Sequence, residues 1–289
     1  MIRKLLLSAF LMASCSSAPE TLRFGAMTDC QYCAKPTAGR RHYDESPRKL
    51  QVAMEEFQRL HPEWLVHLGD FIDDRYESFE PVLKICRAFD FHIYHVLGNH
   101  DFSVEDKFKD GIHKLLSMPA PYYSWATKGW RFIALDGNEL SLYAHPKGSP
   151  KDLESRAYYA QLNPKPATYN GAIGPQQIAW LRLQLEAAGK KGEKVILLCH
   201  FPLLPIAADN LWNAPEMLSL IDQHPCVKAW LNGHNHHGGY AERKGVHYLT
   251  FQGMVDTPDN SFALVEIDEK SIRIRGYGRE PDRDLLIKK

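Results

Sequence analysis

The segment WLVHLGDFIDD at residues 64–74 decides the fold, because an apolar, β-prone run ends there in a glycine and an aspartate. Branched and aromatic residues at 64–68 predict a buried strand, and Gly69-Asp70 marks where the chain leaves it. The same arrangement recurs four more times. The five polar clusters that follow such runs are Asp29-Cys30-Gln31, Gly69-Asp70 with Asp73, Gly98-Asn99-His100-Asp101, Cys199-His200 and Gly233-His234-Asn235-His236.

Helical patterns separate the first three of these apolar runs. We expect strands at 22–27, 64–68 and 92–97, with helices between them. The first helix begins at Ser46-Pro47, an N-cap followed by proline, and the second covers 78–89. This β-α-β-α-β order predicts a parallel sheet with right-handed crossovers. Parallel strands deliver their C-terminal ends to one edge of the sheet, so the clusters are expected to meet there.

The second half of the chain predicts further strands at 130–135, 195–198 and 227–231. Three short strands follow at 246–251, 262–267 and 272–276, and this closing run predicts a second sheet packed on the first. A helix opens at Gly174-Pro175 and is expected to stop at Gly189. Residues 137–173 lack clear periodicity, which is typical of a functional loop or a disordered segment.

The composition is that of a globular protein. Of the 289 residues, 44% are hydrophobic, and 35 Lys+Arg balance 35 Asp+Glu to give a formal net charge of zero. That balance argues against a nucleic-acid-binding protein that works through a broad basic surface. A small anionic substrate stays compatible with it, because bound metal ions supply local positive charge.

The first nineteen residues have the pattern of a secretory signal. Arg3 and Lys4 precede a short apolar run, and small residues lead to Cys15. The sequence MASC at 12–15 resembles a bacterial lipobox, so we expect export to the periplasm or cell envelope and a lipid anchor at Cys15. A plain cleaved signal peptide is the alternative. Residues 20–289 are expected to form a single domain.

Five cysteines follow Cys15, an odd number, so at least one is free if the others pair. The spacing Cys30-x-x-Cys33 is compatible with a redox site or half a zinc site. A second pair at metal spacing is missing, however, and we favour neither. Cys86 and Cys199 lie on apolar patterns and are expected in the core. The sequence leaves open whether Cys30 and Cys33 pair.

The donor types in the five clusters favour metal chemistry. Carboxylates, amides and imidazoles around one point suit two divalent cations, and such a pair is built for in-line attack on phosphorus. Taken alone, each signal has a plainer reading: an aspartate at a strand end is commonly a cap, and residues 234–237 read as a surface histidine tract. Asn99 can bind a cation through its carbonyl oxygen, which leaves His100 beside the phosphoryl group to stabilise charge or protonate a leaving group. Asp101 or Asp73 would orient that imidazole.

In this order, the clusters resemble the calcineurin-like metallophosphoesterase superfamily, whose motifs run D-x-H, G-D-x-x-D, G-N-H-D/E, H and G-H-x-H. The resemblance spans about residues 29–236. It implies a four-layer αββα sandwich of two mixed β-sheets with a dimetal site at the C-terminal strand edge. It also implies His100 as the catalytic histidine and Asp70 as a bridging ligand. The implied ligands are Asp29, Gln31, Asp70 and His236 for one ion, and Asp70, Asn99, His200 and His234 for the other.

The departure from the superfamily pattern is Gln31, which stands where histidine is usual. A glutamine carbonyl is a hard, neutral oxygen donor, so the change favours Mn²⁺ or Mg²⁺ over Zn or Fe. Glutamine there resembles the subgroup of manganese-dependent ADP-ribose/CDP-alcohol diphosphatases. Further local matches to that subgroup are Arg40-Arg41-His42-Tyr43, Tyr169-Asn170-Gly171, Gly238-Gly239-Tyr240 and the tail 275–283.

The resemblance implies hydrolysis of the diphosphate linkage in a small nucleoside diphosphate derivative, by in-line attack of a metal-bridging hydroxide. Expected substrate contacts are Arg41, Tyr43, Asn170, Phe201 and Trp212, with Tyr32 and Arg40 as further candidates. Two other functions stay open. One is a phosphomonoesterase or cyclic-nucleotide phosphodiesterase with the same metals, and the other is an exported binding protein without turnover. The sequence does not fix the oligomeric state.

Overall fold

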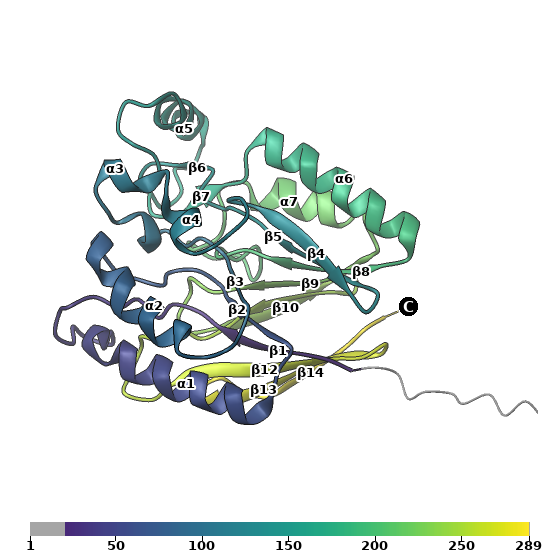
Figure 1. The fold of residues 1–289 in the computed structure, drawn as a ribbon. Coiled ribbons are helices and arrows are strands. Elements are labelled where there is room, and N and C mark those ends of the chain that lie inside the picture. The colour runs from purple at the N-terminus through teal and green to yellow at the C-terminus, as the bar shows by residue number, and fades with distance from the viewer. Residues whose placement is uncertain (1–20, 289) are drawn as a thin grey trace, which may run out of the picture.

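The computed structural model describes residues 21–288. Two six-stranded sheets face each other, and helices cover the outer face of each (Figure 1). Both sheets are mixed, so the predicted four-layer αββα architecture is confirmed. The expected signal segment and its Cys15 lie outside the described residues. No helix between residues 21 and 288 has the length and apolar character needed to cross a membrane.

The first sheet joins both ends of the chain. Its strands β1, β2 and β3 pair in parallel, as the βαβ pattern predicts, and β12 then pairs antiparallel with β1. Two further antiparallel strands extend this edge. In spatial order the strands are β14 (Arg283–Leu286), β13 (Ser271–Gly278), β12 (Ser261–Ile267), β1 (Leu22–Met27), β2 (Trp64–His67) and β3 (Ile93–His95).

The second sheet has four parallel strands at its centre and one antiparallel strand at each edge. In spatial order the strands are β10 (Gly239–Arg243), β11 (Val246–Thr250), β9 (Val227–Asn232), β8 (Lys194–Leu198), β5 (Trp130–Ala134) and β4 (Tyr123–Thr127). A separate pair consists of β6 (Leu140–Ser141) and β7 (Gly171–Ala172).

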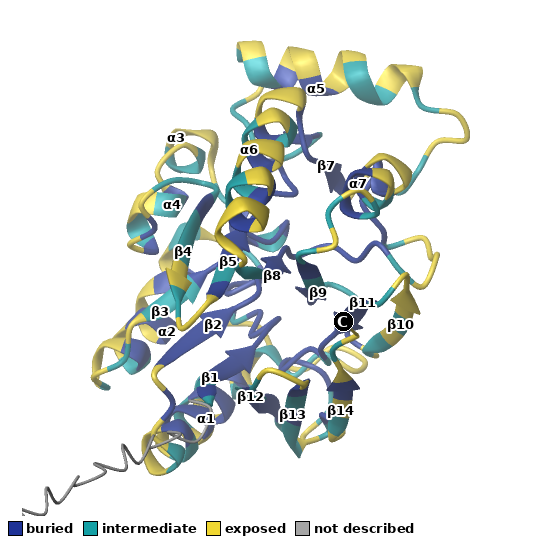
Figure 2. Ribbon diagram, turned by 90° about the vertical axis from the view of Figure 1, so that its right-hand side faces the viewer, coloured by how far each residue is buried: buried dark blue, intermediate teal, exposed yellow. Residues whose placement is uncertain are grey.

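Four helices form the two outer layers (Figure 1): α1 (Ser46–Leu60) and α2 (Phe79–Arg87) against the first sheet, α6 (Pro175–Lys191) and α7 (Ala214–Ile221) against the second. The remaining helical elements are α3 (Asp106–Lys109), α4 (Ile112–Leu115), α5 (Pro150–Gln161), η1 (Tyr43–Glu45), η2 (Tyr76–Ser78) and η3 (His100–Phe102). Figure 2 shows that the buried residues concentrate in the strands, whereas the outward faces of the helices are exposed.

Strand alternation gives each sheet an apolar layer on both of its faces. Along β5, Phe132 belongs to the cluster between the sheets and Ile133 to the cluster beneath α6 and α7. Between the sheets, Phe24 stacks on Trp64 with ring centroids 4.3 Å apart, and Phe132 meets the edge of both. On the other face of β1, a side chain at Gly25 would lie 2.6 Å from the Phe57 ring, so glycine lets α1 approach the strand.

Three expectations about the fold are wrong. Of the closing strands, only β11 joins the second sheet, while β12 and β13 return to β1 and complete the first. The stretch 137–173 contains α5, whose start repeats the Ser-Pro signal of α1: Ser149 accepts a hydrogen bond from the Asp152 amide, and Pro150 follows. Helix α6 passes Gly189 and ends at Lys191, because the left-handed cap is Gly192, with φ +68°. Strands β4, β6, β7, β10 and β14 have no counterpart among the predicted strands.

Candidate metal centre

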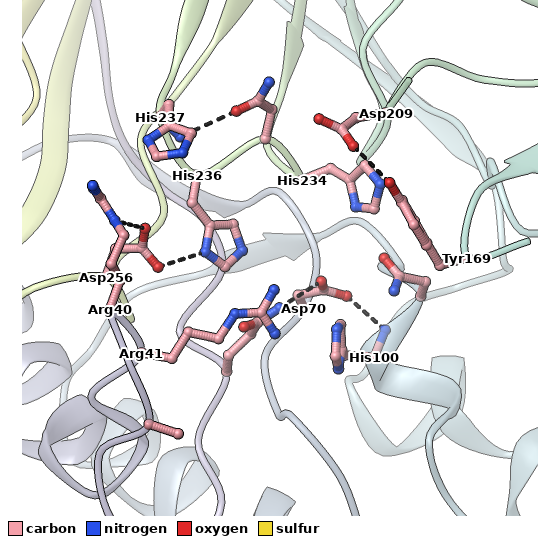
Figure 3. A pocket seen from close by; sticks show the side chains of 14 residues that line it. Arg40, Arg41, Asp70, His100, Tyr169, Asp209, His234, His236, His237 and Asp256 are labelled. Atoms are coloured by element: carbon pink, nitrogen blue, oxygen red, sulfur yellow. Dashed lines mark hydrogen bonds and ion pairs between the residues drawn. The ribbon is translucent and has the colours of Figure 1, made fainter. Parts of the chain in front are cut away.

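Residues of four of the five polar clusters line one pocket at the C-terminal ends of the parallel strands (Figure 3), and His200, from the fifth cluster, is buried beside Asp70. Asp70, after β2, lies at its centre. Its Oδ2 atom is 3.2 Å from His200 Nε2, which follows β8, and accepts a hydrogen bond of 3.0 Å from the Gln31 side chain. Its Oδ1 atom accepts from the His100 amide at 2.8 Å. One carboxylate therefore contacts residues of three of the other four clusters.

Two groups of donors lie on either side of Asp70. On one side, His236 Nε2 is 3.2 Å from Asp29 Oδ1, and Gln31 lies nearby. On the other side, His234 Nδ1 is 3.2 Å from His200 Nε2. The ligand atoms of Asp70, His200 and His234 all lie within 4.8 Å of one another, a spacing that suits a metal ion. Asn99 also lines the pocket.

Unpaired oxygens test whether these residues fit metal ions. Gln31 Oε1 and Asn99 Oδ1 are buried and accept no hydrogen bond from any residue between 21 and 288. Asp29 Oδ1 is likewise buried, with only the His236 ring nitrogen at ion-pair distance. An orphaned buried acceptor costs roughly 1–3 kcal/mol. Three such oxygens in one pocket, beside imidazole nitrogens, fit two divalent cations that would complete their coordination.

The backbone is strained at the same points. Four candidate ligands that are not glycine have positive φ: Asp29 at 51°, Gln31 at 43°, Asp70 at 57° and His234 at 69°. Residues other than glycine rarely adopt positive φ, and each such residue costs the folded state of order 1–3 kcal/mol of conformational free energy. Strain that gathers on four donors of one pocket indicates that the fold holds these side chains for a function.

Two glycines let these loops approach closely. A side chain at Gly69 would lie 2.5 Å from His200 Nδ1, and the residue has φ +98°. A side chain at Gly98 would lie 2.1 Å from Asp70 Oδ1. Both positions therefore need glycine so that the imidazole and the carboxylate can occupy the centre.

The close approach of carboxylates and imidazoles shifts the pKa values of these groups. Burial alone would raise the pKa of Asp29 and Asp70, but His236 and His200 hold the two pKa values below the ordinary range. Burial would likewise lower the pKa of His200 and His236, yet the carboxylates raise each to about 9. His234 behaves differently, because burial and the neighbouring His200 lower its pKa to about 3. The carboxylates thus demand positive charge beside them, which divalent ions would supply.

Each candidate histidine ligand has its other ring nitrogen engaged. His236 Nδ1 is 2.8 Å from Asp256 Oδ1, and His234 Nε2 is 2.9 Å from Asn170 Oδ1. His200 Nδ1 lies 2.8 Å from the Leu68 carbonyl oxygen. Such partners fix the tautomer and ring orientation of a ligand and raise its basicity. The nitrogens that face the pocket are accordingly Nε2 of His200 and His236 and Nδ1 of His234.

The three predicted catalytic residues take distinct positions. His100 lines the pocket, and its Nδ1 atom is 2.9 Å from the Asp73 carbonyl oxygen and 3.3 Å from Asp73 Oδ1. Asp73 therefore orients the imidazole. The alternative, Asp101, does not: both of its oxygens accept from backbone amides, those of Asp70, Phe71 and Gly98. Its carboxylate instead ties the Gly98 loop to the Asp70 loop.

The predicted substrate contacts are brought together only in part. Arg41 lines the pocket, and although burial alone would lower its pKa, the neighbouring Tyr43 helps to raise it. Asn170 is buried behind His234, and its amide donates to the carbonyls of Ala208 and Asn210. Phe201 is fully buried, with its ring 4.7 Å from the His234 ring. Trp212 packs against Tyr159 in a separate apolar cluster. Phe201 and Trp212 are packing residues because neither exposes a ring to the pocket.

Sequence reasoning missed Asp256, Asp209 and the role of Tyr169. The ring of Tyr169 is 46% exposed at the pocket mouth, and its hydroxyl donates to Asp209 at 3.0 Å. The pocket has a volume of about 620 Å³, within the usual range for small-molecule sites. The missed signal for Asp256 is its position shortly after β11, the same strand-end placement as the other carboxylates.

The five cysteines between residues 21 and 288 are free thiols. Cys30 and Cys33 are buried, and burial raises the pKa of Cys33 to about 11. A protonated, buried thiol is a poor nucleophile, which leaves no support for a redox function.

Comparison with known proteins finds the same combination of fold and motifs. The family model of the calcineurin-like phosphoesterases matches residues 22–238. A Xenopus laevis protein named manganese-dependent ADP-ribose/CDP-alcohol diphosphatase is 30% identical, over 91% of this chain and 89% of its own length. A Homo sapiens protein of the same name is 28% identical, over 94% and 95%. The fold matches the crystal structure of a dimetal phosphatase from Danio rerio with a TM-score of 0.84, at 24% identity over 94% of this chain and all of that one.

Proposed function

Because the chain belongs to the calcineurin-like phosphoesterase family, we propose that it hydrolyses the diphosphate linkage of small nucleoside diphosphate derivatives of the ADP-ribose and CDP-alcohol type. The chain is a metal-dependent phosphoesterase whose cofactors are two divalent ions, and Mn²⁺ is the favoured metal. The observation that carries the proposal is the buried amide oxygen of Gln31, which has no hydrogen-bond partner among residues 21–288, while the amide nitrogen of the same side chain donates to Asp70. A hard, neutral donor in that place suits Mn²⁺, the metal in the names of the similar proteins.

The ligand sets follow from the two groups of donors. Asp29, Gln31, Asp70 and His236 would hold one ion, and Asp70, Asn99, His200 and His234 the other, with Asp70 shared. When bound, the two ions supply Lewis acidity and positive charge for attack of water at phosphorus.

Residues around the ions bind and orient the substrate. Arg40 and Arg41 line one wall, where guanidinium groups suit the oxygens of a diphosphate. Arg41 Nη1 is 3.8 Å from Asp73 Oδ1, so that carboxylate holds both the guanidinium and the His100 imidazole. On the far wall, the exposed ring of Tyr169 offers a face on which a base can stack.

His100 presents its Nε2 atom to the pocket, because Nδ1 faces Asp73. Because Nδ1 donates to the Asp73 carbonyl, the ring in its protonated form also donates from Nε2 to charge that develops on the phosphoryl oxygens. A phosphate leaving group needs little protonation, so charge stabilisation is its main task in a diphosphate substrate. A poorer leaving group, an alkoxide, would depend on proton transfer from the same ring.

A substrate panel with Mn²⁺ tests the proposal. ADP-ribose, CDP-choline, cAMP and p-nitrophenyl phosphate are compared by kcat/KM, with products identified by ³¹P NMR. We expect the two diphosphates to turn over fastest, giving AMP with ribose 5-phosphate and CMP with phosphocholine. Faster turnover of cAMP or p-nitrophenyl phosphate would replace the proposal by the phosphodiesterase or phosphomonoesterase alternative.

We also propose, from the sequence alone, that residues 1–19 direct export and that Cys15 carries a lipid. The full chain is expected in the membrane fraction of a Gram-negative host, and Cys15→Ser in the soluble fraction. Equal partitioning of both proteins would contradict the lipid anchor.

A further inference from the structure

The segment 253–257 is a connection that the metal centre depends on. Its backbone bonds to two candidate ligand loops: the Val255 amide donates to the Asp29 carbonyl at 2.9 Å, and the Gly253 amide to the His236 carbonyl at 3.2 Å. Asp256 projects from the same segment. Its Oδ1 atom lies 2.8 Å from His236 Nδ1, and its Oδ2 atom accepts from Arg40 at 3.3 Å. The conformation of this segment therefore sets the orientation of a metal ligand and of a pocket arginine.

This conformation is strained. Thr257, a β-branched residue, has φ +59°, which side chains of this shape rarely adopt. Its amide donates to the Arg40 carbonyl at 2.7 Å. Such strain persists only where surrounding contacts over-determine the backbone, and those contacts are often part of a functional site. The segment thus needs a partner that holds its carbonyl groups.

Lys49 of α1 is that partner. The side chain is only 1% exposed, although lysine is almost never fully buried in proteins. Its ammonium donates to the carbonyl of Met254 at 3.0 Å, to that of Val255 at 3.4 Å and to that of Thr257. Three carbonyl oxygens around one positive charge are the surroundings that a bound monovalent cation would find. Burial lowers the pKa of Lys49 to about 8, still above neutral pH, so the group is mostly charged.

No carboxylate among residues 21–288 forms an ion pair with this ammonium, so its hydrogen bonds go to backbone carbonyls alone. Asn260 adds a bond in the opposite direction, from its side-chain amide to the Lys49 carbonyl at 2.8 Å. Lys49 therefore joins helix α1 to this part of the chain both through its side-chain ammonium and through its backbone carbonyl. If the Lys49 side chain only filled space, its substitution by leucine or methionine would leave Mn²⁺ affinity unchanged.

We propose that Lys49 is a positioning residue of the dimetal centre: its buried ammonium fixes the carbonyls of Met254, Val255 and Thr257, and this holds Asp256 where it orients His236. The inference rests on the metal centre and not on the substrate class. If Lys49 proves not to position the centre, the proposed substrate class still stands. If the substrate panel contradicts that class, the proposed role of Lys49 still stands.

Mn²⁺ binding to the metal-free protein is the first test, measured by electron paramagnetic resonance titration. Lys49→Met keeps the length of the side chain and removes the charge. We expect one of the two Mn²⁺ sites to weaken by about tenfold or more, as for other groups that orient a ligand, with kcat mostly recovered at saturating Mn²⁺. Unchanged affinity at both sites in a folded variant would overturn the proposal.

Phe57→Leu is the matched control, because Phe57 is buried on the same helix and faces β1 and β12 instead of the segment. It should lower thermal stability without a change in Mn²⁺ affinity. An equal loss of affinity in both variants would show that Lys49 acts only through general stability. Lys49→Gln, which keeps a donor without the charge, gives the same comparison if Lys49→Met does not fold, and wild-type affinity in it would refute the role of the charge.

Two further measurements separate positioning from packing. In Lys49→Ala, 100 mM ammonium should restore part of the lost Mn²⁺ affinity, since it can occupy the three-carbonyl site, whereas Phe57→Leu should not respond. In metal-free protein with ¹⁵N-labelled histidine, Lys49→Met should shift the ring nitrogens of His236 and leave those of His224, beside α7, unchanged. Absence of both effects would contradict the proposed path through Asp256.

Discussion

The Nδ1 atom of His236 lies 2.8 Å from the Oδ1 atom of Asp256, twenty residues later in the chain. Both residues are buried, and the opposite nitrogen of the imidazole faces Asp29. The carboxylate therefore holds the ring so that Nε2 is free for a metal ion, and it makes that nitrogen more basic.

Removal of this contact should weaken one metal site. We expect Asp256→Asn to lower Mn²⁺ affinity by roughly 10–100-fold, because the amide no longer supplies a negative partner to the ring. Isothermal titration of the metal-free protein measures the effect, with Asp110→Asn on the surface as control. The account of Asp256 would be refuted by wild-type affinity at both sites.

His100 is expected to act in the reaction without holding metal. His100→Ala should lower kcat by about 100-fold or more, the usual range for a positioned acid or charge stabiliser, while both Mn²⁺ ions stay bound. Steady-state kinetics and metal analysis of the same sample measure the two quantities. Loss of a metal ion in this variant would instead make His100 a ligand, and an unchanged kcat would remove it from the mechanism.

Gln31 should set the choice of metal. Its oxygen has no partner among residues 21–288, while its amide donates to Asp70. In the wild type, Mn²⁺ is expected to activate the chelated protein better than Zn²⁺ does. Gln31→His replaces a hard oxygen by an imidazole nitrogen, so the ratio of the two activities should fall. A wild type that Zn²⁺ activates better would contradict the hard-donor argument.

Two histidines behind the centre should make stability depend on pH. Burial lowers the pKa of His67 to about 4 and that of His95 to about 3. The unfolded chain, with a pKa near 6.5, binds these protons first, so stability is fully present above about pH 6.5 and is lost as the pH falls toward 4. Because neither ring nitrogen of His67 has a hydrogen-bond partner in the described chain, His67→Phe should reduce this loss. Thermal melting from pH 4.5 to 7.5 measures the slope, and an equal slope in both proteins would refute the assignment.

The sequence predicts most of the elements that carry the candidate ligands. Strands β1, β2, β8 and β9 follow from apolar runs and end where polar clusters begin, and the order of elements predicts parallel pairing. Assignment of the last strands fails for a physical reason. Short antiparallel strands carry no signal for the sheet that they join, and β12 pairs with β1, more than two hundred residues away.

Residues around the candidate ligands are harder to predict, because their role depends on which loops touch. Asp256 and Tyr169 lie in no motif of metal donors, and the packing of their loops brings both to the pocket. Phe201 and Trp212, predicted as substrate contacts, are buried: Phe201 packs against His200 and His234, and Trp212 packs against Tyr159. In the sequence, Lys49 has the pattern of a solvent-exposed charge on a helix. Only the structure shows that its ammonium is bound by the carbonyls of Met254 and Val255.

The central claim is that seven side chains from five loops hold two metal ions, and anomalous diffraction at the manganese edge tests it most directly. Crystals grown with Mn²⁺ should show two peaks on opposite sides of Asp70, one beside Gln31 and His236 and the other beside Asn99, His200 and His234. A single peak, or peaks away from these residues, would contradict the account.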